Sequence, residues 1–448
     1  MLTFLSNRGA NSIIKLRTYF VLFALSNIGL NCAYADTIKP QELYTVQPTI
    51  MPELSKNGEY KVGVKTIKVI NKNQLELTNF TATKDRSLTL EVWYPAQLDS
   101  KQTLASYNDV TRAHNAFSLQ GEAYRDAPAL SKGKFPIVIL SHGYTGYRSI
   151  MFYMGEHLAS HGYVVAAIDH TDSTNADIDF ENNPGGGFLS TLFNRSRDQQ
   201  FVLDYFSKDN SSLWQIIDTN QASVIGYSMG GYGAINTVGG CYNFTSNGLQ
   251  NIGFPENLTK SLLPLLNFCN AGRSLVDPKW KAMVALAPWG QEHNVHHANS
   301  LASIDVPSLY IVGDEDDIVG YEHGVKKLFE QSSMHNNYLM VFENARHNVA
   351  PHPAPKISYL SEFEIGQYIE PVWSNERLNR VNEHMVLAFL DCHVKEDSKR
   401  CAYLPTREDI TQTKQDNGKL SEAWPGFADR WGAGVLFYRR DATNKASQ

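Results

Sequence analysis

The sequence has few cysteines and no block of positive charge, and the second absence excludes two classes of partner. After position 35 the chain carries 37 basic and 46 acidic side chains, a net charge of −9. A mildly acidic chain without a basic patch is a poor partner for nucleic acid or for an anionic membrane surface. Internal repeats and low-complexity tracts are also missing. With 42% hydrophobic residues among 448, the chain is predicted to be globular, with a large core.

The N-terminal residues also lack an apolar run long enough to cross a bilayer. A basic stretch precedes the apolar run 19–30 and the small-x-small sequence Ala33-Tyr34-Ala35. This pattern predicts a cleaved secretory signal at residues 1–35. An uncleaved anchor and a lipoprotein acylated at Cys32 are the alternatives. We therefore expect a periplasmic or secreted protein with no transmembrane segment after cleavage.

Removal of Cys32 with the signal leaves four of the five cysteines. An even number of cysteines in an exported chain predicts two disulfides. We prefer the local pairing, Cys241–Cys269 with Cys392–Cys401, among the three connectivities that are possible. Zinc binding is the competing use, but neither pair has the C-x-x-C spacing of a zinc site.

Apolar runs of strand length alternate with segments of helical periodicity, which predicts a parallel sheet covered by helices on both faces. The strand-like runs lie at 135–140, 163–168, 222–225, 282–286, 308–312 and 338–342, and the helical segments at 149–160, 195–207, 229–238, 321–332 and 376–394. Residues 60–70 and 87–94 alternate in the manner of antiparallel strands. The predicted fold is α/β, with a mostly parallel central sheet and leading antiparallel strands.

The mature chain is predicted to form one domain, residues 36–448. Residues 172–194, with a Gly-rich stretch, and residues 240–279, bounded by the first cysteine pair, do not fit the alternation and are interpreted as insertions. The second of them is expected to form a small cap. The tail after Cys401 carries Trp424, Phe427 and Trp431 and is expected to dock against the domain.

The sequence Gly226-Tyr227-Ser228-Met229-Gly230 lies between a predicted strand and a predicted helix. A G-x-S-x-G elbow needs small residues two before and two after the serine, because the strand and helix pass too close for side chains. Ser228 is therefore a candidate nucleophile. The alternative is a Gly-rich turn of a Rossmann-like unit.

A serine nucleophile requires a base, and usually an acid that orients the base. In an open parallel sheet these groups follow the carboxyl ends of strands. Asp316 follows the run 308–312, with Asp317 as the alternative acid, and His347 follows the run 338–342, with His352 as the alternative base. The non-catalytic alternative is that the acids only cap a helix and that His347 is a solvent-exposed loop residue.

The tetrahedral intermediate of acyl transfer needs donors for its oxyanion. We assign them to the backbone amides of Met229, directly after the nucleophile, and Tyr144, in the loop after residues 135–140. The Tyr144 side chain is then expected to lie over the acyl group. His142 is interpreted as a structural hydrogen bonder under this loop.

Motifs spread over residues 60–395 follow one another as in a known group. They are Trp93-Tyr94-Pro95, Ser141-His142-Gly143-Tyr144, His157–Tyr163, Asp169-His170, Gly226–Gly230, Ala287-Pro288-Trp289, Gly313–Glu322 and Asn344–Asn348. In this combination the chain resembles the predicted dienelactone-hydrolase group of bacterial α/β-hydrolases, which is related to platelet-activating-factor acetylhydrolases and cutinase-type polyester hydrolases. The order Ser228, Asp316, His347 is the order of α/β-hydrolases.

The resemblance implies a serine hydrolase of carboxylic esters without a cofactor, acting through Ser228, Asp316 and His347, with Trp289 in the acyl or alcohol subsite. The substrate would be a small-molecule or lipid ester. A phospholipid or platelet-activating-factor-like acyl hydrolase, a polyester hydrolase and a non-catalytic binding protein on the same fold are the alternatives. Two departures matter: true dienelactone hydrolases have a cysteine where Ser228 stands, and compact cutinases have no counterpart of 240–279.

Two further clusters have plainer interpretations. His293-x-x-His296-His297 has only Glu292 as a nearby acid, so we expect a polar pocket rim rather than a metal site. On the predicted helix 195–207, the basic residues and Asp198 are expected to form an ion pair that ties the helix down. Anion binding by Arg195 is the alternative.

Overall fold

The computed structural model describes residues 38–44, 51–98, 101–208, 215–269, 276–332, 336–405, 409–411, 425–428 and 431–440. The predicted signal peptide and Trp424 lie outside these residues. The described residues from Pro40 onward form one compact unit. Among the described residues, no helix is both long enough and apolar enough to pass through a bilayer.

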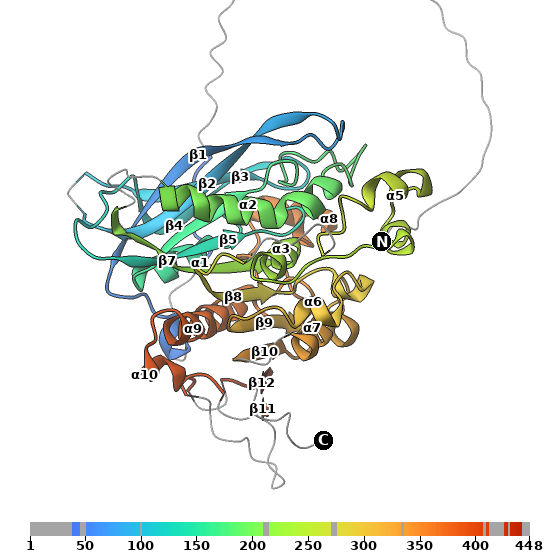
Figure 1. The fold of residues 1–448 in the computed structure, drawn as a ribbon. Coiled ribbons are helices and arrows are strands. Elements are labelled where there is room, and N and C mark those ends of the chain that lie inside the picture. The colour runs from blue at the N-terminus through green and yellow to red at the C-terminus, as the bar shows by residue number, and fades with distance from the viewer. Residues whose placement is uncertain are drawn as a thin grey trace, which may run out of the picture. The chain divides into compact units, whose positions relative to one another are not determined.

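Twelve strands of the described residues form one sheet (Figure 1). Their order across the sheet is β11-β12-β10-β9-β8-β7-β5-β6-β2-β1-β4-β3. The strands are β1 Lys61–Leu75, β2 Thr83–Ala96, β3 Leu104–Val110, β4 Ala116–Arg125, β5 Phe135–Ser141, β6 Val164–Asp169, β7 Ile217–Tyr227, β8 Trp280–Leu286, β9 Ser308–Gly313, β10 Asn337–Phe342, β11 Asp409–Thr411 and β12 Val435–Arg440.

The centre of the sheet is parallel, as the continuous apolar runs predict. β6, β5, β7, β8, β9 and β10 pair in parallel, and β5, β9 and β10 are buried along their whole length. β6 lies on one side of β5 and β7 on the other. The order of the strands therefore reverses between β5 and β7, and the loops that follow these two neighbouring strands lead in opposite directions. Open α/β sheets bind ligands at such a switch point.

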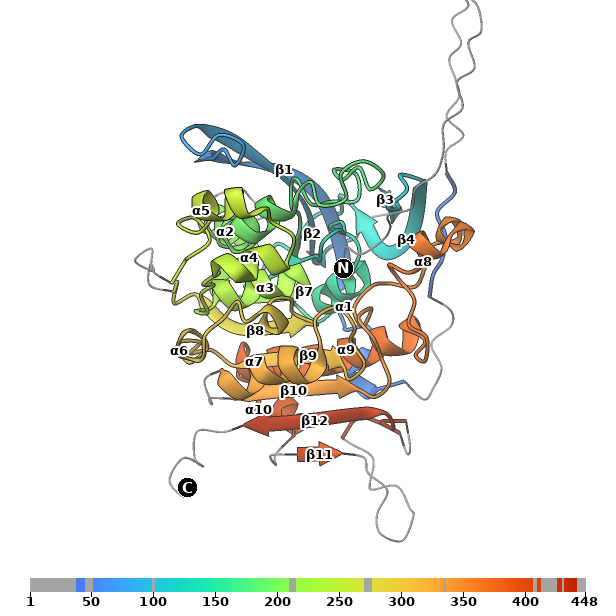
Figure 2. The ribbon, with the colours of Figure 1, turned by 90° about the vertical axis from the view of Figure 1, so that its right-hand side faces the viewer.

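Helices cover both faces of the sheet, as predicted. Figure 2 shows α2 and α3 on one side of the strands and α1 and α9 on the other. The α-helices are α1 Phe152–Ser160, α2 Phe188–Lys208, α3 Met229–Thr237, α4 Ser246–Asn251, α5 Glu256–Leu262, α6 Ala298–Leu301, α7 Lys326–Gln331, α8 Glu362–Ile365, α9 Asn375–His393 and α10 Ser398–Cys401; the shorter turns are η1 Glu53–Ser55, η3 Gln291–His293, η5 Lys356–Leu360 and the π-helical η4 Tyr321–Val325.

The antiparallel part of the sheet is larger than predicted. β1 and β2 are the expected leading pair, but β3 and β4 add an antiparallel hairpin, and β4 joins it to β1 by a short parallel pairing at Gly63 and Val64. The tail after Cys401 was expected only to dock, whereas its β12 pairs antiparallel with β10 and extends the sheet. Phe427 is buried and Trp431 is 36% exposed, so the apolar tail residues anchor this extension unequally.

Of the two predicted insertions, 172–194 ends earlier than expected and 240–279 forms two short helices. The interpretation of 172–194 as one excursion is wrong at its end, because α2 begins at Phe188 and buries Leu192 and Phe193. In 240–279 the chain forms α4 and α5, which lie between the disulfide-bonded Cys241 and Cys269. Both expected disulfides, Cys241–Cys269 and Cys392–Cys401, are present, which confirms the local connectivity.

Candidate active site

Ser228 lies at the sharp turn between β7 and α3, with backbone angles φ 52° and ψ −114°. The turn depends on its two flanking glycines. A Cβ on Gly226 would collide with the carbonyl of Gly230, and a Cβ on Gly230 would collide with the carbonyl of Ser141 in β5. The motif therefore forces the positive φ of Ser228, a conformation that costs a non-glycine residue about 1–3 kcal/mol.

Replacing Ser228 with glycine is expected to make the protein more stable than the alanine variant. Glycine adopts φ 52° without the steric cost that alanine retains, while its larger loss of backbone entropy on folding cancels part of that gain. We expect a net difference of about 1 kcal/mol in the free energy of unfolding, measured by urea denaturation of both variants. A glycine variant less stable than the alanine variant would show that the turn is not strained.

His347 and Asp316 complete a chain of hydrogen bonds that begins at Ser228. His347 Nε2 lies 3.1 Å from Ser228 Oγ, and His347 Nδ1 lies 2.9 Å from Asp316 Oδ2. Asp316 Oδ1 also accepts the amides of Ile318 and Val319 at 2.9 and 3.0 Å. Burial alone would raise the pKa of Asp316, but the charge of His347 and these hydrogen bonds outweigh it and hold the pKa below its usual value. The carboxylate is thus ionised beside the imidazole.

The two alternatives from the sequence lie elsewhere. Asp317 is partly exposed and pairs with Arg346 at 2.5 Å. His352 is buried, with Nε2 2.7 Å from the Tyr147 hydroxyl and Nδ1 2.7 Å from the Pro353 carbonyl. Neither alternative has a hydrogen bond to Ser228 or His347 within the described part of the chain.

Glu370 holds the loop that carries His347 in place through hydrogen bonds. The sequence did not predict this role. Its two carboxylate oxygens accept the amides of Arg346 and Asn348 at 2.6 Å each, one on either side of His347. Burial raises the pKa of Glu370, and the two amides lower it in part. The His347 ring also lies 5.3 Å from the Tyr227 ring. No spacing signal links Glu370 to His347, because they lie on separate loops.

Two backbone amides beside the serine have no acceptor among the described residues. Met229 is the first residue of α3, where N–H groups have no partner within the helix. The amide of Tyr144 follows Gly143, whose Cβ, if present, would lie 3.1 Å from Ser228 Cβ. Free amides at these two positions can act as oxyanion donors. The Tyr144 hydroxyl donates to the Pro184 carbonyl at 2.8 Å.

A buried polar network underlies the Tyr144 loop. His142 Nε2 accepts the amide of His170 at 3.2 Å, so His142 Nδ1 carries the proton and donates to the Gly143 carbonyl at 2.6 Å. The His170 ring bridges Ser141 and Asp198, and Asp198 also binds Arg86. His142 therefore occupies the structural position that the sequence suggests.

Aromatic side chains from four segments form a connected group that begins beside the serine. Trp289, whose amide donates to the Ser228 carbonyl at 3.1 Å, packs edge-on against Phe188, with ring centroids 5.6 Å apart. Phe188 also contacts Tyr144 at 5.4 Å and Phe254, from the 240–279 insertion, at 6.3 Å. Trp289 is buried, whereas the other three rings are half-buried. This set of Tyr144, Phe188, Phe254 and Trp289, which we call the aromatic wall, suits an apolar or aromatic substrate group.

The histidine cluster after Trp289 has separate surroundings for each ring. The His293 ring lies 5.2 Å from the Trp289 ring at a tilt of 48°, His296 is buried against Asn236, and His297 contacts Asn243. Burial raises the pKa of the adjacent Glu292 to about 8. Within the described residues, no group of three or more His, Cys, Asp or Glu side chains is arranged to hold a metal ion.

The helix α2 differs from expectation in its ion pairs. Asp198 pairs with Arg86 of β2 rather than with a basic residue of its own helix. Arg197 donates to the Phe193 carbonyl and the Tyr242 hydroxyl and lies over the Phe193 ring. Arg195 makes no carboxylate pair among the described residues. An ion pair therefore ties α2 to the sheet, as the sequence predicts, but the partner of Asp198 is Arg86 of β2.

Comparison with known proteins finds similarity to proteins named as acetylhydrolase, cutinase and esterase. Residues 47–185 match the family model "Platelet-activating factor acetylhydrolase, isoform II". Cutinase est1 of Thermobifida alba is 29% identical over 49% of this chain and 54% of its own length, and platelet-activating factor acetylhydrolase of Cavia porcellus is 28% identical over 27% and 29%. The solved ferulic acid esterase of Streptomyces cinnamoneus aligns with a TM-score of 0.53 and 19% identity, over 80% of this chain and 94% of that one.

These matches show which proteins the chain is related to and which fold it shares with them. The chain spans about half the length, or less, of the curated relatives that it matches. The ferulic acid esterase likeness shows a common fold along nearly the whole of that enzyme. The chain is thus an α/β-hydrolase related to platelet-activating-factor acetylhydrolases and cutinases.

Proposed function

We propose that this α/β-hydrolase is an exported serine hydrolase of carboxylic esters. The observation that carries the proposal is the hydrogen-bonded chain Ser228–His347–Asp316 beside two free backbone amides. A serine hydroxyl becomes an effective nucleophile when a histidine takes its proton and an acid fixes that histidine. The relatives named as cutinase and platelet-activating factor acetylhydrolase support an ester as the substrate. Export is supported by the two disulfides.

The reaction proceeds in two halves. Ser228 Oγ attacks the ester carbonyl carbon as His347 Nε2 accepts its proton, and the amides of Tyr144 and Met229 bind the oxyanion. The bond to the alcohol oxygen then breaks, and His347 returns the proton to the leaving alcohol. Water attacks the acyl-enzyme by the same route and releases the acid. Asp316 holds Nδ1–H of His347 in place and stabilises the imidazolium.

The aromatic wall bears on the substrate. Phe254 belongs to the 240–279 insertion and contacts Phe188, so the insertion contributes one ring to the wall. Bulky rings beside the serine favour a short or compact acyl group over a long chain or a polymer. A phospholipid or platelet-activating-factor-like ester is the second candidate, because the matched family model is that of a platelet-activating factor acetylhydrolase.

Hydrolysis of p-nitrophenyl esters from acetyl to palmitoyl tests the proposal. We expect the highest kcat/KM at acetyl to butyryl and a fall of at least about tenfold by palmitoyl, since one misplaced methylene costs about 1–3 kcal/mol in a closed pocket. A peak at long chains would favour a lipid substrate, and activity on polyester film would favour a polymer.

A fluorophosphonate probe separates the enzyme from the non-catalytic alternative. The probe phosphonylates an activated serine and releases fluoride, so mass spectrometry should find the label on the peptide that contains Ser228. A folded protein that hydrolyses none of the esters and leaves Ser228 unlabelled would be a binding protein on this fold.

A further inference from the structure

Arg195 of α2 is a buried cation without a carboxylate partner. It is 1% exposed, and its Nε and Nη1 atoms have no hydrogen-bond partner among the described residues. Its remaining nitrogen, Nη2, lies 3.1 Å from Ser173 Oγ and 3.4 Å from the Gly143 carbonyl oxygen. Burying a cation without a counter-ion costs several kcal/mol. An apolar side chain would fill the same space without that cost, so the charge calls for an explanation.

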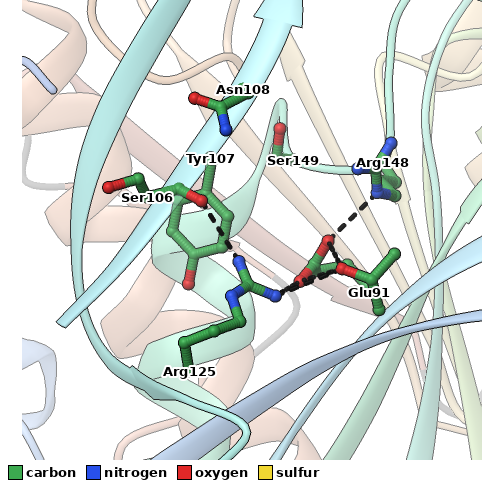
Figure 3. A pocket seen from close by; sticks show the side chains of 8 residues that line it. Glu91, Ser106, Tyr107, Asn108, Arg125, Arg148 and Ser149 are labelled. Carbon is green, nitrogen blue, oxygen red and sulfur yellow. Dashed lines mark hydrogen bonds and ion pairs between the residues drawn. The ribbon is translucent and has the colours of Figure 1, made fainter. Parts of the chain in front are cut away.

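Several other partly or fully buried arginines of the chain do have carboxylate partners. Figure 3 shows Arg125 and Arg148 both directed at Glu91, with which each forms an ion pair. Arg86 binds both oxygens of Asp198 at 2.8 and 2.9 Å. The nearest carboxylate to Arg195 along α2 is therefore already occupied by another arginine and by the His170 ring.

The fold provides a dedicated space for the Arg195 side chain. Its stem passes between α2 and α3 at Gly233, where a Cβ would press against Arg195 Cβ and Cγ. Burial lowers the pKa of Arg195 to about 9, while the charge of Asp198 raises it in part. The guanidinium therefore remains positively charged at neutral pH, directly behind the Tyr144 loop.

The group that Arg195 faces is the far side of an oxyanion donor. The carbonyl of Gly143 and the N–H of Tyr144 belong to one peptide unit, and in a trans peptide they point in opposite directions. His142 Nδ1–H donates to that carbonyl at 2.6 Å. The 3.4 Å approach of Arg195 is long for a hydrogen bond, so the guanidinium acts mainly through its charge.

We infer that Arg195 is a positioning residue that, with His142, polarises the Gly143–Tyr144 peptide and so strengthens the Tyr144 amide as an oxyanion donor. This inference rests on the proposed function. A cation at the carbonyl end increases the positive charge at the N–H end, and chains of polar groups reinforce one another in this way. The benefit grows as the oxyanion develops, so it favours the transition state over the bound ester.

The test compares Arg195→Met with wild type using an ester substrate and two inhibitors. A trifluoromethyl ketone adds to Ser228 and forms an oxyanion, whereas the matching alcohol binds without forming one. We expect Arg195→Met to lower kcat about 10- to 100-fold and to weaken the ketone in parallel. KM and the affinity for the alcohol should stay within twofold of wild type.

Arg197→Met is the matched control, because Arg197 lies two positions along the same helix and contacts Phe193 and Tyr242 instead. It should leave the affinity for the ketone unchanged. Arg195→Gln provides a second neutral variant if the methionine variant does not fold. Arg195→Lys keeps a cation on a shorter reach and should restore part of kcat.

Two results would overturn the inference. One is a folded neutral variant with kcat within threefold of wild type, and the other is an equal loss of affinity for the ketone and the alcohol. Active-site titration with the fluorophosphonate corrects each rate for folded enzyme. A wild-type protein without label or ester hydrolysis would instead reject the proposed function, so the two failures are distinguishable.

Discussion

Replacing Ser228 with alanine is expected to reduce kcat/KM for the best p-nitrophenyl ester by about 10⁴- to 10⁶-fold. The variant keeps the strained turn and the hydrogen bond between His347 and Asp316, so the folded structure should persist. What disappears is the atom that forms the acyl-enzyme. Steady-state kinetics, with circular dichroism and thermal unfolding for the fold, would measure both expectations.

Ser223→Ala is the matched control for that experiment. Ser223 lies on the same strand, β7, and its buried hydroxyl has no hydrogen-bond partner among the described residues. Removing that hydroxyl should leave kcat/KM unchanged within about twofold. If Ser228→Ala retained more than a tenth of the wild-type rate, Ser228 would not be the nucleophile, whatever its geometry.

Replacing Asp316 with asparagine should lower kcat about 10³- to 10⁴-fold while KM changes little. The asparagine oxygen can still accept the amides of Ile318 and Val319, so the loop keeps its shape. Its NH₂ group would then face His347 Nδ1 and favour the tautomer that protonates Nε2. In that tautomer Nε2 cannot accept the proton of Ser228. Rates measured on folded enzyme, counted by active-site titration, test this loss.

Asp317→Asn is the built-in comparison, since it makes the same chemical change one residue further along. The Asp317 side chain is 35% exposed, and its pair with Arg346 is a surface ion pair worth about 0–1 kcal/mol. We expect kcat within threefold of wild type and little change in stability. A reversed result, with a large loss for Asp317→Asn alone, would assign the acid to Asp317.

Much of the fold was predictable because the central strands are buried on both faces. Such strands read as continuous apolar runs, and all six runs correspond to β5 to β10. The strands β3, β4 and β12 were missed because each is only partly buried, so no continuous apolar run marks it. The start of α2 was placed seven residues too late, because the glycines before Phe188 suggested a longer loop.

The candidate site was predictable to the extent that its chemistry follows strand ends. Ser228, Asp316 and His347 come directly after parallel strands, and the structure brings them within hydrogen-bond reach. The contacts that support the site could not be predicted in this way. Glu370 and Arg195 act on loops far from them in the chain, and only the folded arrangement shows that the carboxylate faces two amides and the guanidinium faces a carbonyl.

The strand β12 also determines how the sheet ends. Without it, β10 would present a row of unpaired backbone groups beside the strand that leads to His347, and such an edge is a template for pairing with another molecule. The outermost described strand on that side is instead β11, which has three residues, Asp409–Thr411. A strand of this length offers few backbone groups for pairing with another molecule. The C-terminal segment thus protects the folded protein against edge-to-edge aggregation as well as completing its sheet.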